Sequence, residues 1–303
     1  MIASVSAENI YKTSTISTVR TILDNISRIK QIREELVPSD ELPFLCVTYA
    51  QTLDGNIAIH KNKNQKTSTS SNLNLSSEES FLLTHALRSQ FDGILIGGNT
   101  LRSDNPRLNN RLWAEDWHEF EEGKMVLKST SGELKQPIPI ILDTHLRHVM
   151  DMVESSHFIK AAVNHELIIV CCSQEAYDQH RKRIQSHCVS NNFAIELLPC
   201  ASNDSSPGLD LEDVVYNLCM IHGIYSIMVE GGASVLSGFL SNRELVDCVC
   251  VTICPRMVGA CGLNALGSAN VGSKDDDDAG SNMLEFDESK WFTLGPDCIF
   301  LAS

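Results

Sequence analysis

Short apolar runs alternate with amphipathic segments along most of the chain. Between residues 44 and 255 the runs read FLCVTYA, DGILIGG, PIPIILD, ELIIVCC, FAIELLP, YSIMVE and LVDCVCVTICP. Their length and β-branched content are typical of buried strands, and the segments between them have the 3.6-residue spacing of helices. Strands that alternate with helices predict an α/β fold, with a mainly parallel central sheet flanked by helices on both faces.

Residues 76–90 carry the clearest helix signal. Ser76 or Ser77 can supply the N-cap oxygen, and the two glutamates that follow place negative charge at the positive end of the helix dipole. The apolar positions expected to face the sheet are Phe81, Leu82 and Leu87. Arg88, near the C-terminal end, is predicted from its position alone to be a surface cation, with a ligand clamp as the alternative.

Two segments fall outside this alternation. Residues 1–42 are polar and contain VRTILDNISRIKQIREEL, whose isoleucines have helical spacing. They predict a helical extension that packs on the body of the protein or on a partner subunit, and residues 43–303 then form one domain. Within this domain, residues 267–282 combine glycine, serine and four aspartates, which predicts a flexible acidic loop on the surface.

Composition narrows the class of protein. The chain has 303 residues, with 24 Lys and Arg against 39 Asp and Glu. The resulting formal net charge of −15 disfavours nucleic acid as a partner. No apolar run reaches the roughly 18 residues that a membrane span needs, and no signal peptide pattern opens the sequence, so a cytoplasmic protein without membrane contact is expected.

Cysteine and histidine do not predict a metal site. The 11 cysteines are odd in number and lie mostly in apolar runs, which is typical of reduced core thiols. Cys248, Cys250 and Cys254 would share one face of a strand and pack there as small hydrophobic residues. His145 and His148 have no cysteine or carboxylate at ligand spacing, so a surface position is favoured for both.

Candidate chemistry begins with the segment SIMVEGGASVLSGFL, from Ser226 to Leu240. A strand that ends in Gly231 and Gly232 and opens a helix lets the backbone approach a ligand, and it directs helix amides at a phosphate. The spacing is not the G-x-G-x-x-G of the dinucleotide-binding fingerprint, so a tight turn without a ligand is an equal alternative.

The segment DGILIGGNTLRSDNPRL repeats this pattern at Gly97 and Gly98. Two glycine turns at the carboxyl ends of strands in one parallel sheet suit a dinucleotide that lies across those ends. The residues Asp104, Asn105 and Pro106 that follow would form an ordinary turn if taken by themselves.

The first predicted strand breaks into polar residues. In LCVTYAQTLDGNIA, the residues Thr52, Asp54 and Gly55 indicate a ligand-facing bend or, on spacing alone, a hairpin turn. The sequence has no G-x-S-x-G elbow, no Walker lysine loop and no zinc-deaminase signature. These absences remove the common hydrolase, NTPase and deaminase interpretations.

Four motifs in order, VTYAQTLDG, LRSQFDGILIGGNTLRSDNPRL, PIPIILD and IMVEGGASVLSGFL, resemble the riboflavin-pathway reductases. The resemblance is to the stand-alone fungal and archaeal type, spans roughly residues 43–265, and extends to the run PDCIFLA near the C-terminus. It implies a dihydrofolate-reductase-like fold with an antiparallel C-terminal strand, and usually a homodimer. It also implies that NADPH reduces the ribosylamino group of 2,5-diamino-6-ribosylamino-4(3H)-pyrimidinone 5′-phosphate to a ribitylamino chain, with hydride delivered to C1′ of the opened sugar.

The resemblance further implies site residues, carried over by position. Those that would line the cofactor are Ala50, Thr52, Thr100 and Asp104, and those that would hold its diphosphate are Gly231, Gly232, Ala233, Ser234 and Val235. Gly97 and Gly98 would let the cofactor pass close to the backbone. Around the phosphoribosyl group the matching positions are Arg88, Leu108 and Arg111. Glu230 would face the substrate and act in catalysis, by stabilising a developing cation or by relaying a proton.

The sequence departs from the bacterial bifunctional relatives. These carry a lysine at the position of Thr48 and an N-terminal deaminase domain, and this sequence shows neither. Both departures fit reduction before deamination, so the expected substrate keeps its 2-amino group. Two alternatives stay open: a reductase of the same fold that acts on the deaminated pyrimidine or a pterin-like substrate, and a non-catalytic nucleotide-binding protein.

Overall fold

The computed structural model describes residues 7–36, 41–59, 75–111, 135–154, 160–203, 208–265 and 286–303. Its centre is a nine-stranded sheet in the order β10-β11-β8-β1-β7-β3-β4-β5-β6. The strands are β1 (Phe44–Thr52), β3 (Gly93–Gly97), β4 (Ile138–Leu142), β5 (Ile168–Ser173), β6 (Ile195–Cys200), β7 (Ser226–Gly231), β8 (Cys248–Cys254), β10 (Ser289–Leu294) and β11 (Asp297–Ala302).

The predicted α/β fold is confirmed. All neighbouring pairs from β8 to β6 are parallel, and each of these strands coincides with one of the predicted apolar runs. At the other edge β11 pairs antiparallel with β8, as the resemblance implied. The edge strand β10, which pairs antiparallel with β11, was not predicted from the sequence.

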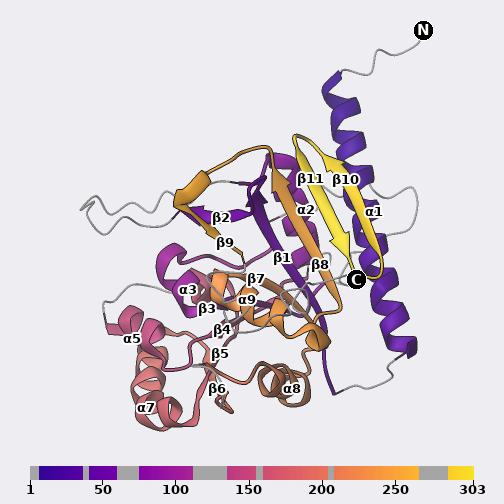
Figure 1. The fold of residues 1–303 in the computed structure, drawn as a ribbon. Helices are drawn as coiled ribbons and strands as arrows, with labels where there is room; N and C mark the ends of the chain where they lie inside the picture. The colour runs from indigo at the N-terminus through magenta and orange to yellow at the C-terminus, as the bar shows by residue number, and fades with distance from the viewer. Residues whose placement is uncertain are drawn as a thin grey trace, which may run out of the picture.

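Helices cover both faces of the sheet (Figure 1). One face buries its apolar side chains under α8 (Leu211–His222) and α9 (Ala233–Ser241). On the other face the helices form two groups. The first group, over β3 to β6, is α3 (Gly98–Asp104), α5 (Arg147–Glu154), α6 (Lys160–Asn164) and α7 (Gln174–Asn191). The second group, over β1, β8 and β11, is α1 (Ala7–Leu36) and α2 (Glu78–Arg88). The boundary between the two groups lies over β7 and β3.

The N-terminal extension packs on the body of the protein, which is one of its two predicted locations. Val19, Ile22 and Ile26 of α1 are buried in the cluster that contains residues of α2, β8, β10 and β11, and Figure 1 shows α1 lying along the β10–β11 end of the sheet. Arg33 Nε lies 2.9 Å from Asp247 Oδ1. None of the described helices is both long and apolar enough to cross a membrane. The predicted acidic loop, residues 267–282, lies outside the described residues.

The helix α2 begins as predicted but is rotated from its expected orientation. Ser77 is its N-cap and accepts the Ser80 N–H, and Asp297 Oδ2 of β11 accepts the Ser77 N–H at 2.9 Å. The prediction that Phe81 faces the sheet is wrong, since its side chain is 44% exposed. The helix instead buries Leu83, Ala86 and Leu87 on the sheet, and it buries His85 and Arg88 toward the loop that follows α3.

The cysteines pack in the core, as the sequence analysis predicted. All are buried except Cys261 and Cys298. Cys46 of β1 and Cys248 of β8 are opposite each other in the register of the two strands, and both are free thiols. Cys250 lies two residues further along β8. The hydrogen bond with Cys248 and burial hold the pKa of the Cys46 thiol well above its usual range. The Cys46 thiol therefore stays protonated and unreactive near neutral pH.

The polar break after β1 is a turn. The Gly55 N–H donates to Thr52 O at 2.9 Å, with Gly55 in the left-handed region at φ +76°. The short strand that follows, β2 (Asn56–Ile59), pairs with β9 (Gly262–Asn264) and not with β1, so the predicted hairpin is replaced by a separate two-stranded sheet. Two 3-10 turns, at Arg243–Leu245 and Gly259–Cys261, complete the described elements.

Candidate active site

The two glycine turns lie side by side at the carboxyl ends of β3 and β7, which are neighbours in the sheet. A Cβ on Gly232 would lie 2.5 Å from Thr100 Oγ1, and one on Gly97 would lie 2.8 Å from Val235 Cγ2. Thr100 Oγ1 also donates to Gly231 O at 3.2 Å. Each turn therefore occupies the space that a side chain on the other would need, and the pair presents bare backbone where two helices begin.

A groove of about 590 Å³ runs across these strand ends. Its lining includes Gly97 and Gly98 from the first turn and Ser234 and Val235 from the second. The groove therefore brings together four of the residues predicted to bind the cofactor, and Gly231 and Gly232 lie just before Ser234 in the chain. From β3 to β6 each new strand is added further from β1, and β7 then comes back to lie between β1 and β3. The groove lies at this change in the order of the strands. Ligands of open α/β sheets bind at such points.

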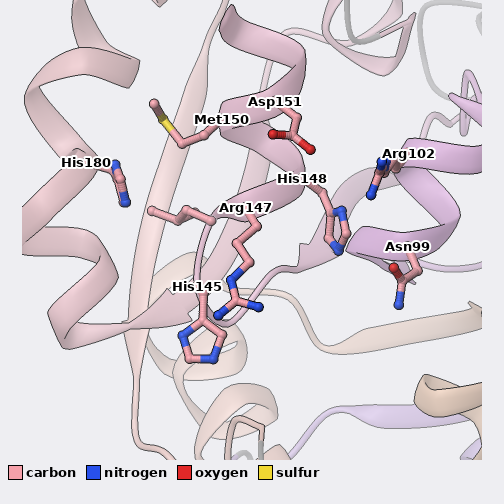
Figure 2. A pocket seen from close by; sticks show the side chains of 9 residues that line it. Asn99, Arg102, His145, Arg147, His148, Met150, Asp151 and His180 are labelled. Carbon is pink, nitrogen blue, oxygen red and sulfur yellow. The ribbon is translucent and has the colours of Figure 1, made fainter.

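A second cavity, of about 600 Å³, adjoins this groove and is basic (Figure 2). The two cavities share Asn99, His145, Arg147 and His148. The second also has Arg102 from α3, Asp151 from α5 and His180 from α7 in its wall. His145 is exposed, as predicted, and His148 is half-buried in the cavity wall. His148 is drawn inward because Asp143 Oδ2 accepts its backbone N–H at 2.8 Å.

Arg88 and Glu230 form a bidentate ion pair at the boundary between the two helix groups. Arg88 Nε donates to Glu230 Oε1 at 2.7 Å, and Arg88 Nη2 donates to Glu230 Oε2 at 2.6 Å. Arg88 is 9% exposed, so the prediction from position alone that it is a surface cation is wrong. Its guanidinium avoids solvent because a carboxylate 142 positions away in sequence satisfies it.

Glu230 reaches this position through an irregularity in the sheet. Leu95 of β3 pairs with Val229 and the next residue, Ile96, pairs with Gly231, so Glu230 is an extra residue in β7. A bulge of this kind re-aims a side chain and is frequent beside active sites. The chain thus places a carboxylate immediately before the glycine turn of β7.

The loop after α3, residues 105–111, is held against α2. Its Asn109 carbonyl accepts from Arg88 Nη1 at 2.9 Å, and its Arg111 N–H donates to His85 Nδ1 at 3.0 Å. Leu108 has φ +56° and is 1% exposed. A left-handed leucine costs roughly 1–2 kcal/mol, and strain of this kind gathers at functional sites. With its side chain in the core, Leu108 can offer a ligand its backbone.

Positive charge gathers where this loop meets α2. Partial desolvation is the main cause that lowers the pKa of Arg111, which is otherwise exposed; the guanidinium groups of Arg88 and Arg107 lower it further, while Glu230 raises it. The Arg111 guanidinium lies 5.0 Å from the centroid of the Phe81 ring. A site with three arginines and one carboxylate is suited to an anionic group such as a phosphate.

Two of the predicted cofactor residues sit on β1. Ala50 is half-buried and pairs with Thr252 of β8. Thr52 is fully buried, and its hydroxyl bonds to the Asp54 carboxylate and accepts the Asn56 N–H at 3.0 Å. The hydrogen bond from Thr52, followed by that from the Gly259 amide, lowers the pKa of Asp54 to about 2. These contacts hold the turn, and a cofactor contact by Thr52 stays a prediction.

The remaining predicted cofactor residues sit on α3. Thr100 lies in its first turn beside Gly231, and Asp104 ends the helix and is exposed. The two are four residues apart and so share one helix face. Their contact with a cofactor also stays a prediction.

Sequence reasoning missed three contributors: His85, the Asn109 carbonyl and Arg147. The signal for Arg147 was present, because it follows β4 closely and β4 is the neighbour of a strand that ends in a glycine turn. No comparable signal marks His85 or Asn109, whose partners are 26 and 21 residues away in sequence. Among the described residues, no group of three or more His, Cys, Asp or Glu side chains could hold a metal ion.

Comparison with known proteins gives consistent relatives. The sequence profile of the RibD C-terminal domain matches residues 43–300. The 2,5-diamino-6-ribosylamino-4(3H)-pyrimidinone 5′-phosphate reductase of Schizosaccharomyces pombe is 28% identical, over 87% of this chain and 89% of that protein. The reductase of the same name from Eremothecium gossypii is 30% identical, over 74% of this chain and 78% of that protein.

Solved structures share the fold. The riboflavin biosynthesis reductase Rib7 of Saccharomyces cerevisiae has a TM-score of 0.54 at 22% identity, and the match covers 86% of this chain and 89% of that one. RibD of Acinetobacter baumannii has a TM-score of 0.60 at 17% identity, with the match covering 86% of this chain and 58% of that one.

Proposed function

This chain belongs to the RibD C-terminal domain family, and from this premise we propose that it reduces 2,5-diamino-6-ribosylamino-4(3H)-pyrimidinone 5′-phosphate to the ribitylamino product with NADPH. The observation that carries the proposal is the order Glu230, Gly231, Gly232 at the end of β7. The bulge turns Glu230 toward Arg88, while the glycine turn that follows leads into α9, whose Ser234 and Val235 line the groove. One strand end therefore presents a substrate side and a cofactor side.

The residues present fit a nicotinamide dinucleotide. Gly97 and Gly98 line the groove without side chains, so a diphosphate can approach the backbone there. When bound, the cofactor supplies hydride. The first amides of α9 would hold its diphosphate, with Ser234 at the rim of the groove.

Glu230 is proposed to position the substrate rather than to donate a proton. An ionised carboxylate has about four lone-pair sites, and Arg88 uses one on each oxygen. The remaining sites can accept hydrogen bonds from sugar hydroxyls or from the amine next to the reacting carbon. A carboxylate at this place also favours positive charge that develops on the substrate beside it.

The direct test follows NADPH absorbance with the freshly prepared 2,5-diamino substrate, with its 2-oxo counterpart and with a pterin. We expect oxidation with the first and a much lower kcat/KM with the others. Oxidation of NADPH by the 2-oxo compound alone would support a reductase of the deaminated pyrimidine. Binding of NADPH without oxidation by any of the three would support a non-catalytic role.

Preference for NADPH over NADH is proposed from the basic cavity of Figure 2. Arg102, Arg147 and the histidines beside them adjoin the groove, so they lie where the adenosine end of a cofactor held at the glycine turns would reach. A 2′-phosphate there would gain charge-assisted hydrogen bonds, which NADH cannot make.

Replacing Arg147 with alanine is expected to raise KM for NADPH by roughly tenfold and to leave KM for NADH nearly unchanged, since a hydrogen bond to a charged group contributes about 1.5 kcal/mol or more. Steady-state kinetics with both cofactors measure this. Arg181→Ala removes an exposed arginine that stacks on Tyr177 outside the cavity and is the control. Equal effects on NADPH and NADH would place the 2′-phosphate elsewhere.

Arg111 is proposed as the principal partner of the substrate phosphate. Arg88 already donates to Glu230 and to the Asn109 carbonyl, whereas Arg111 is exposed at the edge of the site. Arg111→Ala is expected to raise KM for the phosphorylated substrate by roughly tenfold or more and to change KM for the dephosphorylated one little. Arg107→Ala, which removes a neighbouring exposed arginine, should have a smaller effect. An equal penalty on both substrates would show that Arg111 does not bind the phosphate.

The homodimer and the cytoplasmic location stay predictions from the sequence. Sedimentation velocity of the purified chain measures the first.

A further inference from the structure

His85 is buried between α2 and the 105–111 loop, beside the arginines of the proposed substrate site, and its second ring nitrogen has no role so far. It lies on α2 one turn before Arg88 and is 1% exposed. Its Nδ1 accepts the backbone N–H of Arg111 at 3.0 Å. A neutral imidazole that accepts at Nδ1 carries its proton on Nε2, so this contact fixes the tautomer.

The surroundings keep the imidazole neutral. Burial and, after it, the guanidinium groups of Arg88 and Arg111 lower the pKa of His85 to about 3. Protonation would place a third positive charge between two arginines and would turn the acceptor of the Arg111 N–H into a donor. The ring therefore remains a neutral Nε2–H tautomer across the physiological range.

The Nε2–H has no hydrogen-bond partner among the described residues, although it is buried. Buried donors are nearly always paired, and an unpaired one costs about 1–3 kcal/mol. The His85 ring packs on the Phe81 ring at a centroid distance of 4.3 Å, and the Arg111 guanidinium lies over the same Phe81 ring. The unpaired donor thus sits among the groups assigned above to an oxygen-rich, anionic substrate.

We propose that His85 is a substrate-positioning residue, which fixes the 105–111 loop through Nδ1 and donates its Nε2–H to an oxygen of the sugar phosphate. This inference rests on the proposed function, since it needs the substrate to lie between α2 and that loop. It explains why a buried donor is left without a partner and why a histidine holds the backbone of Arg111.

Two conservative variants separate the two ring nitrogens. In His85→Asn, the side-chain oxygen can take the place of Nδ1 but nothing replaces Nε2–H. In His85→Gln, the longer amide can place an N–H near the Nε2 position. We expect His85→Asn to raise KM for the substrate about tenfold with little change in KM for NADPH, and His85→Gln to stay within about threefold of the wild type.

His222→Asn is the matched control, because His222 also has a buried Nε2 without a partner and lies before the start of β7, at the opposite end from Glu230. It should leave KM for the substrate unchanged. A wild-type KM in His85→Asn would overturn the proposal. So would equal impairment of His85→Asn and His85→Gln accompanied by the same increase in KM for NADPH, which is the pattern of a structural role.

Nuclear magnetic resonance of the wild type with ¹⁵N-labelled histidine tests the inference without variants and without turnover. The His85 ring should report the Nε2–H tautomer at pH 7, and its Nε2 signal should shift when ribose 5-phosphate is added. An Nδ1–H tautomer, or an Nε2 signal that does not respond to saturating ribose 5-phosphate, would overturn the proposal. Failure of the NADPH assay would instead count against the proposed function, so the two failures are distinguishable.

Discussion

Replacing Arg88 with methionine is expected to lower kcat/KM for the substrate by at least about 100-fold and the free energy of unfolding by about 2–3 kcal/mol. The variant leaves the Glu230 carboxylate without its two guanidinium bonds and the Asn109 carbonyl without its donor. Breaking a fully buried ion pair costs about 3–5 kcal/mol, and the expected value is lower because the Glu230 side chain is 18% exposed. NADPH absorbance and urea unfolding measure the two effects.

A second ion pair in the chain serves as the control. Arg33 and Asp247 have side-chain exposures of 19% and 18%, and they join α1 to the start of β8 away from the site. Arg33→Met should lower the free energy of unfolding and leave kcat/KM near that of the wild type. If it lowers kcat/KM as much as Arg88→Met does, the loss in Arg88→Met reflects general destabilisation.

Glu230→Gln, measured alongside, separates positioning from proton transfer. If the carboxylate acts as a hydrogen-bond acceptor, the variant lowers kcat/KM and the shape of the pH profile between pH 6 and 9 stays the same. Loss of one limb of that profile would show that the Glu230 carboxylate acts as an acid or base. The double variant with Arg88→Met should cost less than the sum of the single changes, since the two residues contact each other.

The sequence predicts the strands and the glycine turns because both depend on local patterns. The apolar run ELIIVCC forms most of β5, and the side chains are buried throughout that strand. Gly231 and Gly232 have φ of +101° and +92°, a conformation that side chains other than glycine rarely adopt. A glycine pair after an apolar run therefore marks the turn before any partner is known.

The environment of Arg88 depends on residues far away in sequence. A helical arginine near a C-terminus is usually solvated, and only the bulge in β7 brings Glu230 within reach. The exposure of Phe81 has the same origin, because burial of His85 and Arg88 rotates α2. The edge strand β10 was missed because Lys290 and Trp291 are exposed on it, so it lacks the apolar run that marks the inner strands.

Replacing Gly232 with alanine is expected to raise KM for NADPH by at least about tenfold and to lower the free energy of unfolding by about 2–3 kcal/mol. The backbone there has φ +92°, and the new Cβ would lie 2.5 Å from Thr100 Oγ1. Either the Thr100 side chain must move or the turn must open; opening separates α9 from α3 and moves the helix amides away from the diphosphate. Cofactor titration and thermal unfolding measure the two effects.

Gly208→Ala is the matched control, because Gly208 lines the same groove and a Cβ there meets nothing within 4 Å. It should leave both quantities close to wild type. Adding Thr100→Ala to Gly232→Ala removes the steric contact but not the unfavourable φ, so the double variant should regain part of the lost stability. A wild-type KM for NADPH in Gly232→Ala would mean that the cofactor does not approach the turn, and the assignment of the groove would then have to be abandoned.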